Sequence, residues 1–184
     1  MAKKTKIGFV LIICFAIILI LLYINMNPPV SPDDIKVEAT LQKIDSNVHP
    51  YKDYLIDINI IKNKDCHVII YPYGHNLVGM TYNLNEQKDY FIPSSIGSDG
   101  ITRNVALKEL TNQNLIQENE EVSFTGFWFP DEVGRYKSRM YIDLLDEPNG
   151  INDLVLVCVY IEEKYGKQLT WAKTVPVDID MRKD

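Results

Sequence analysis

The chain has 184 residues, of which 46% are hydrophobic, and its formal net charge is −6 at pH 7. After the apolar N-terminal stretch about 150 residues remain, which is the ordinary size of one domain. The excess of acidic residues opposes contact with phosphate backbones, so no nucleic acid is expected among the partners.

The N-terminus predicts a membrane anchor, because residues 7–24 contain no charged side chain. Eighteen residues of helix span about 27 Å, close to the roughly 30 Å of a bilayer core. Tyr23 lies where an interfacial aromatic residue is expected. The stretch is preceded by three lysines: Lys3, Lys4 and Lys6. By the positive-inside rule, residues 1–6 are cytoplasmic and the C-terminal domain lies outside.

An uncleaved, integral single-pass anchor of the cytoplasmic membrane is therefore expected. A cleavable signal peptide needs a shorter apolar core followed by small residues at a cleavage site. The residues that follow the apolar stretch here, Asn-Met-Asn-Pro, offer no such site.

Residues 25–34 predict a short spacer between this anchor and a domain at 35–184. Three prolines lie within five residues, and proline fixes φ and favours an extended chain. The spacer is thus expected to be semi-rigid.

Alternation of apolar and polar residues predicts strands through most of the domain. It is clearest over residues 35–41 and 54–60. Further strands are predicted at 66–71, 122–129, 140–145, 154–161 and 169–177, with a loop at 131–137. The apolar segment 154–161 is expected to be a central strand, and Pro176 places the last strand at a sheet edge.

Residues 99–110 depart from this pattern, because apolar residues four apart favour a short helix, although a strand also fits. The sequence predicts an all-β fold, either an immunoglobulin-like antiparallel sandwich or an oligonucleotide/oligosaccharide-binding type of five-stranded barrel with one helix and an added hairpin.

Two cysteines, Cys66 and Cys158, lie within apolar strands of the domain. Outside the cytoplasm a disulfide between them is chemically allowed. The alternative is that both are small buried residues with free thiols.

No catalytic or metal-binding signature is recognised. Cys66 and His67 are adjacent on a strand and point to opposite faces, so they do not easily share one ion, and zinc-type spacings are absent. Ser94, Ser95 and Ser98 lack a nucleophile-elbow pattern. No cofactor is expected.

Aromatic residues at two strand ends are candidates for a contact surface: Tyr71, Tyr73 and Trp128. If Phe127 and Phe129 face the core, strand alternation directs Trp128 outward. The opposite phase buries Trp128 and is also compatible with the sequence.

The sequence thus favours a membrane-tethered, noncatalytic binding or assembly module outside the cytoplasm, acting on an envelope protein or a glycan. A cell-envelope hydrolase or other surface enzyme is the alternative.

Overall fold

The computed structural model describes residues 12–23, 30–44, 53–81, 92–94, 100–118, 120, 122, 125–145, 154–164 and 166–180. Strands account for 54% of the structure, and helices are few. The all-β prediction is confirmed at this level.

After the helix at residues 12–23, the domain consists of ten described strands, one α-helix and one 3-10 helix. In chain order these are η1 (Pro32–Asp34), β1 (Ile35–Lys43), β2 (Tyr54–Lys62), β3 (His67–Tyr73), β4 (Leu77–Thr81), β5 (Ile92–Ser94), α2 (Gly100–Asn112), β6 (Gly126–Phe129), β7 (Gly134–Leu144), β8 (Val155–Lys164), β9 (Lys167–Pro176) and β10 (Asp178–Asp180).

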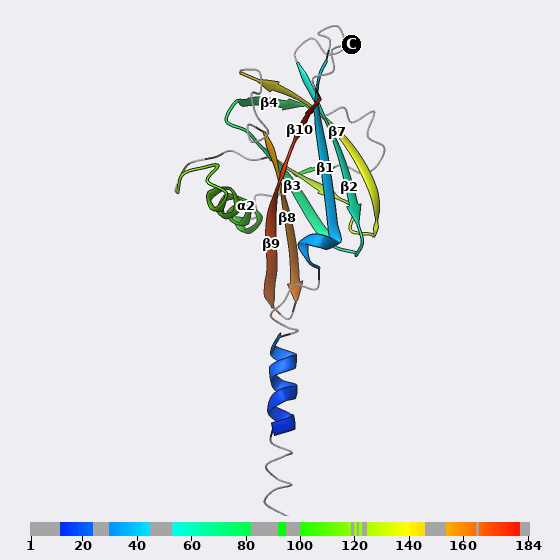
Figure 1. Cartoon of the computed structure of the whole chain (residues 1–184), viewed down its shortest axis with the longest axis vertical. Coiled ribbons are helices and arrows are strands. Elements are labelled where there is room, and N and C mark those ends of the chain that lie inside the picture. The colour runs from blue at the N-terminus through cyan, green and yellow to red at the C-terminus, as the bar shows by residue number, and fades with distance from the viewer. Residues whose placement is uncertain are drawn as a thin grey trace, which may run out of the picture.

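The strands form two five-stranded sheets (Figure 1). The first sheet has the order β10-β1-β2-β7-β4, and the second has the order β5-β6-β3-β8-β9. The described strand pairs are antiparallel except for β1 with β10, where Leu41 lies opposite Ile179 in a parallel pair. The chain passes from β9 in the second sheet to β10 in the first through the buried Val177.

One buried cluster contains side chains from both sheets. In the first sheet, Ile56 and Ile58 of β2 belong to it, and in the second sheet Val68 and Ile70 of β3 do. Polar residues alternate with the buried ones along β1, as the sequence predicts. The predicted central strand corresponds to β8, and the predicted edge strand corresponds to β9.

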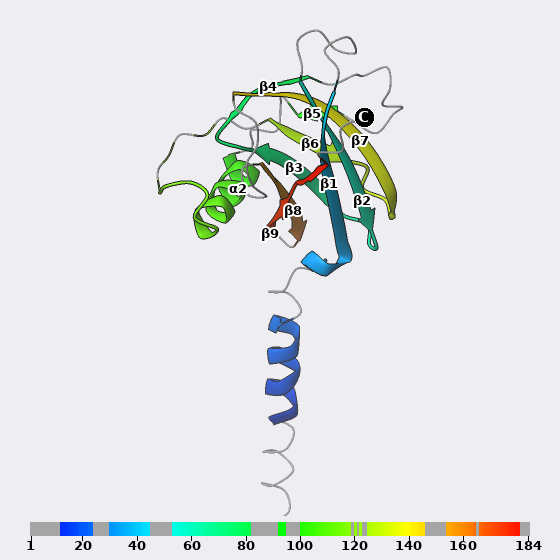
Figure 2. The same cartoon turned by 45° about the horizontal axis from the view of Figure 1, so that its top comes forward.

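The second sheet carries α2 on its other face, beside β8 and β9 (Figures 1 and 2). Thr102, Ala106 and Leu110 are buried along one side of this helix, at the four-residue spacing that places side chains above one another. A second buried cluster joins Ala106 and Leu110 to Ile69 and Tyr71 of β3. The helical interpretation of residues 99–110 is confirmed.

The predicted membrane anchor is corrected by the structure. Residues 12–23 form a helix that projects away from the sheets with its apolar side chains exposed (Figures 1 and 2). The described part of this helix, residues 12–23, spans about 18 Å, which is less than the roughly 30 Å of a bilayer core.

In the part of the chain that the structure describes, no helix has both the length and the apolar character needed to cross a membrane. The predictions of a transmembrane helix at 7–24 and of a single-pass membrane location are therefore wrong. Tyr23 is the last described residue of the helix, whereas Lys3, Lys4 and Lys6 lie outside the described residues.

Residues 30–34 of the predicted spacer contact the domain, whereas residues 25–29 lie outside the described residues. Val30 is buried, and its carbonyl oxygen accepts a hydrogen bond from Trp171 Nε1 at 2.8 Å. Lys173 Nζ donates to the carbonyl oxygen of Pro32 at 2.6 Å. These partners lie on β9, far away in the sequence, which is why local composition did not reveal the contact.

The predicted loop at 131–137 ends earlier, since β7 begins at Gly134. Arg135, Lys137 and Arg139 are exposed there, while Ser138 and Met140 are buried. Exposed and buried residues alternate along this part of β7, but the first fully buried residue is the polar Ser138. The alternation of apolar and polar residues is therefore not visible in the sequence before Met140.

Candidate functional site

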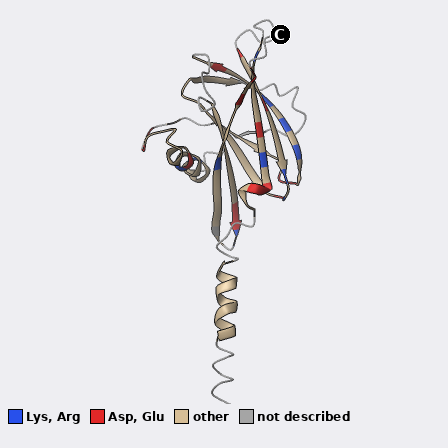
Figure 3. Ribbon diagram, viewed as in Figure 1, with Lys and Arg blue, Asp and Glu red and all other residues tan. Residues whose placement is uncertain are grey.

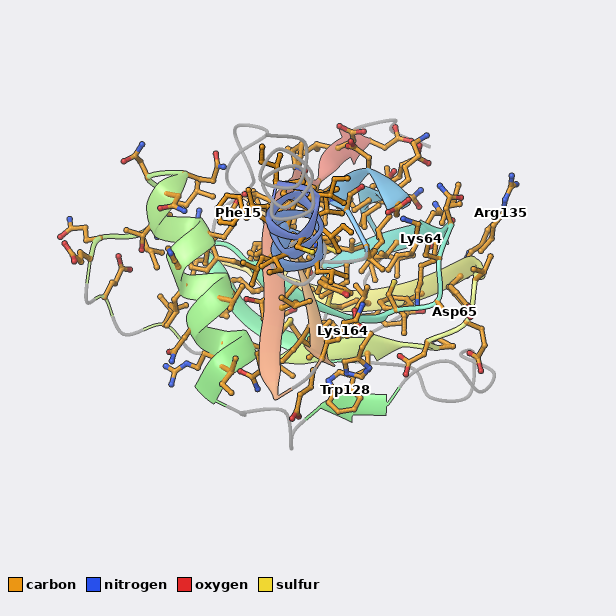
Figure 4. The ribbon with its side chains drawn as sticks, turned by 90° about the horizontal axis from the view of Figure 1, so that it is seen from below. Phe15, Lys64, Asp65, Trp128, Arg135 and Lys164 are labelled. Carbon is orange, nitrogen blue, oxygen red and sulfur yellow. The ribbon has the colours of Figure 1, made fainter. Side chains whose placement is uncertain are left out.

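A pocket of about 690 Å³ opens at the end of the sheets where η1 lies. Segments far apart in the sequence line it: the turn from β2 into β3 (residues 64–67), Asp131 in the loop before β7, the end of β8 (residues 160–163) and Val30. We call this the end pocket. Figure 4 looks onto this end of the molecule.

The ionisable residues that line the end pocket are mostly acidic. It includes four carboxylates but only one lysine, Lys64. The carboxylates are Asp65, Asp131, Glu162 and Glu163. Figure 3 shows acidic residues on η1 and at the end of β8. Lys64 Nζ lies 2.9 Å from Asp34 Oδ2, and this hydrogen-bonded contact lowers the pKa of Asp34. The one lining lysine is therefore already paired with a carboxylate.

Beside the pocket, Lys62 is a buried cation with 1% of its surface exposed. Its ammonium donates to the carbonyl oxygen of Cys66 at 2.5 Å and also to the carbonyl oxygen of Pro130. It lies 5.8 Å from the ring centroid of Tyr136. Burial lowers the pKa of Lys62 below its usual value, and the nearby Cys66 and Asp131 oppose that change.

Two further hydrogen bonds join the same loops. The backbone N–H of Cys66 donates to the carbonyl oxygen of Asp131 at 2.7 Å, and the N–H of Val133 donates to Asp65 Oδ1 at 2.7 Å. With Lys62, these contacts fasten the β2–β3 turn to the β6–β7 loop. The two walls of the end pocket are thus held in a fixed relation.

The inner wall is formed by Tyr160, whose ring stacks on Trp171 at 5.4 Å between centroids and 17° between planes. Its hydroxyl donates to Glu162 Oε2. Burial and this carboxylate contact both raise the pKa of Tyr160. The phenol therefore remains a protonated hydrogen-bond donor at neutral pH.

At the rim, His67 connects the pocket to Trp128. His67 Nδ1 lies 2.9 Å from Asp131 Oδ1. The imidazole and the indole of Trp128 meet edge to face, with 4.5 Å between ring centroids and 84° between planes. Trp128 is 37% exposed, whereas Phe127 and Phe129 are buried, so β6 has the phase that directs Trp128 outward. Figure 4 labels Trp128 in the view of this end.

Tyr71 and Tyr73 do not belong to an exposed aromatic surface, and this part of the prediction is corrected. Both are buried beneath α2, and Tyr71 Oη lies 2.7 Å from Thr102 Oγ1. Burial raises the pKa of Tyr73 to about 12. The helix, which follows them in the sequence, covers the face of β3 that they occupy.

The structure does not bring Cys66 and Cys158 together as a disulfide, and both are buried free thiols. In the β3–β8 register Cys158 lies opposite Ile70, four residues along the strand from Cys66. That offset is about 13 Å at the rise of a strand, whereas bridged cysteines need Cα atoms within about 7 Å.

Cys66, His67 and Asp131 all line the end pocket, which raises the question of thiol catalysis. Cys66 packs in the cluster with Val68, while His67 faces the other side with Trp128. Burial raises the pKa of the Cys66 thiol, although Lys62 opposes this, and a nucleophilic cysteine needs a lowered pKa. The Cys66 thiol therefore does not have the lowered pKa of a nucleophilic cysteine.

Three serines were candidates for a nucleophile. Ser95 and Ser98 lie outside the described residues, and Ser94 is the last residue of β5. Within the described ranges, no three His, Cys, Asp or Glu side chains are grouped to hold a metal ion.

The sequence identified Trp128 as a candidate, but the end pocket was missed. The segment at residues 62–65, which contributes Lys64 and Asp65 to the lining, carries no motif that indicates binding. Comparisons with protein-family models, with curated proteins and with solved structures find no match for this chain.

Proposed function

We propose that this chain is a noncatalytic binding module whose binding surface is the end pocket together with Trp128. The observation that carries the proposal is the ring contact of 4.5 Å between Trp128 and His67, since it joins an exposed indole to the pocket wall. Exposed aromatic residues beside a pocket with a few polar groups are typical of binding sites.

The rigidity of the site supports this function. Hydrogen bonds from Lys62, Cys66 and Val133 hold both loops in place, so little conformational entropy is lost when a ligand binds. We also propose that the two sheets pack face to face as an immunoglobulin-like sandwich. The buried cluster shared by β2 and β3 supports that arrangement.

The test uses the full chain labelled with 5-fluorotryptophan. The chain has two tryptophans, Trp128 and Trp171, and Trp171→Phe assigns their fluorine signals. Peptides of positive, zero and negative charge and neutral oligosaccharides are titrated in turn. We expect at least one of these classes to shift the Trp128 signal saturably. The proposal fails if none of them does so.

A further inference from the structure

We propose that the end pocket binds an arginine or lysine side chain presented by an extended segment of a partner protein, with the indole of Trp128 as its stacking platform. This inference rests on the proposed function and specifies the chemistry of the partner. It follows from charge complementarity, from the accessible aromatic face and from the capacity of the pocket.

The first step concerns charge. Four lining carboxylates face one lysine, and that lysine is paired with Asp34. They come from three separate segments that line one pocket, so the surroundings of the pocket carry a negative charge. Lys62 lies behind the lining with its ammonium directed at backbone carbonyls, and it offsets part of the charge of Asp65 and Asp131, which leaves the lining negative. A cationic ligand group is the occupant that such a lining favours.

The second step concerns hydrogen bonding. The side chain of Asp131 is 64% exposed, and its Oδ1 atom contacts His67. Asp65 receives the N–H of Val133, also through Oδ1. An ionised carboxylate has about four lone-pair sites on its two oxygens. Both groups therefore keep acceptor capacity for the N–H groups of a guanidinium or an ammonium.

The third step concerns Trp128. Its edge-to-face contact with His67 places the indole beside the pocket, next to a lining residue. A cation over an indole face is attracted by the ring quadrupole, and tryptophan is the best aromatic partner for it. Arginine gains most, because its planar guanidinium both stacks on a ring and binds a carboxylate bidentately.

The capacity of the site indicates a peptide segment. A pocket of about 690 Å³ lies within the range of ordinary small-ligand sites, roughly 300–1,000 Å³. One arginine side chain does not fill such a volume. The remaining space suits the neighbouring residues of an extended chain.

The experiment is calorimetric titration of the full chain with the capped peptide Gly-Arg-Gly-Arg-Gly, compared with the same peptide carrying citrulline in place of arginine. Citrulline keeps the shape and removes the charge. We expect the citrulline peptide to bind about tenfold more weakly or worse, the ratio that corresponds to about 1.4 kcal/mol. Affinity should also fall as salt is raised from roughly 0.05 to 0.5 M.

Three variants locate the interaction. Asp131→Asn and Glu163→Gln should each weaken arginine-peptide binding several-fold. Glu163→Gln leaves the partner of His67 in place, so it separates lost charge from a displaced histidine. The control is Glu38→Gln, the same change of charge on exposed β1 of the other sheet, which should leave binding unchanged. Thermal unfolding verifies that each variant is folded.

Equal binding of the citrulline peptide would overturn this inference. So would a neutral oligosaccharide that shifts Trp128 with no response to Asp131→Asn. The proposed function survives either result when a probe still moves the Trp128 fluorine signal. If no probe shifts that signal, both proposals fail together.

Discussion

At the scale of single residues, the site depends on side chains in environments unusual for their type. Lys62 is a charged residue buried at the end of β2, and Trp128 is a large apolar residue at the surface. Lysine is almost never fully buried unless it is paired, and here backbone carbonyls are the partners. Lys62 holds together the loops that line the pocket, and Trp128 exposes an aromatic surface beside the pocket.

Replacement of Trp128 by alanine should change stability only modestly. More than a third of the indole surface is already in solvent, so we expect a loss of about 1–2 kcal/mol in unfolding free energy. Phe127→Ala, which empties a buried position on the same strand, should cost about 3–5 kcal/mol. Urea denaturation compares the two. Equal losses would mean that Trp128 is part of the core.

The buried thiol of Cys158 predicts a loss of stability at alkaline pH. Burial raises its pKa from 9.0 to about 12, so in that window the unfolded chain releases a proton that the folded chain retains. The stabilising contribution is complete below pH 9 and is lost as pH rises toward 12, by up to about 1.4 kcal/mol per pH unit.

Cys158→Ala should therefore flatten the alkaline decline measured by urea denaturation at successive pH values. Cys14→Ala, which removes an exposed thiol from the N-terminal helix, serves as the control and should leave the slope unchanged. Identical slopes for both variants and the wild type would contradict the assignment.

At the scale of elements, Lys62 links the turn after β2 to the loop before β7. Lys62→Met removes both hydrogen bonds and leaves two carbonyls without this donor, at an expected cost of about 1–3 kcal/mol. The amide of Cys66, which bonds the same loop, should exchange its hydrogen faster.

Lys64→Met provides the matched comparison, because it removes a lysine whose ion pair with Asp34 is exposed. Its loss should cost less than about 1 kcal/mol. If the Lys62 variant leaves the exchange of Cys66 unaltered, the two loops do not depend on this cation.

The pairing of β6 with β3 requires glycine at position 126. A Cβ there would lie 2.5 Å from Cε1 of Tyr71 and 2.8 Å from Cγ2 of Ile69, closer than side chains normally approach. We expect Gly126→Ala to cost about 1–3 kcal/mol through overpacking, measured by thermal unfolding.

Gly100→Ala is the control, since a Cβ at the start of α2 meets nothing within 4 Å. It should be neutral or up to about 1 kcal/mol more stable. A neutral Gly126→Ala would show that Tyr71 moves aside at little cost.

At the level of single elements, prediction succeeded where apolar and polar residues alternate within one strand. Ile56 and Ile58 are buried while Asp57 is not, and the sequence alone indicates this. It failed where the evidence lies elsewhere in the chain. Local composition predicts that Val30 belongs to a spacer. In the structure, Trp171, which is 141 residues away, donates a hydrogen bond to the carbonyl oxygen of Val30.

At the scale of the whole molecule, the same reason explains why the end pocket could not be predicted. Asp65, Asp131 and Glu162 are separated by dozens of residues, and only the strand order brings β2, β3, β7 and β8 to one end. Local patterns determine which face a side chain occupies, but the neighbours of that side chain depend on register and sheet order. The sequence leaves the orientation of Trp128 open, because either Trp128 or its two adjacent phenylalanines can face the core, and only the structure shows that the phenylalanines are buried.

The parallel pairing of β1 with β10 has a consequence for biosynthesis. Leu41 leaves the ribosome early, yet its partner Ile179 lies on the last described strand. At about 5–20 residues per second, β1 waits several seconds before the first sheet is complete. During that interval its outer edge is unpaired and can join another nascent chain. Ribosomes crowded on one message therefore favour aggregation of this protein, and any chain terminated before residue 178 keeps that open edge permanently.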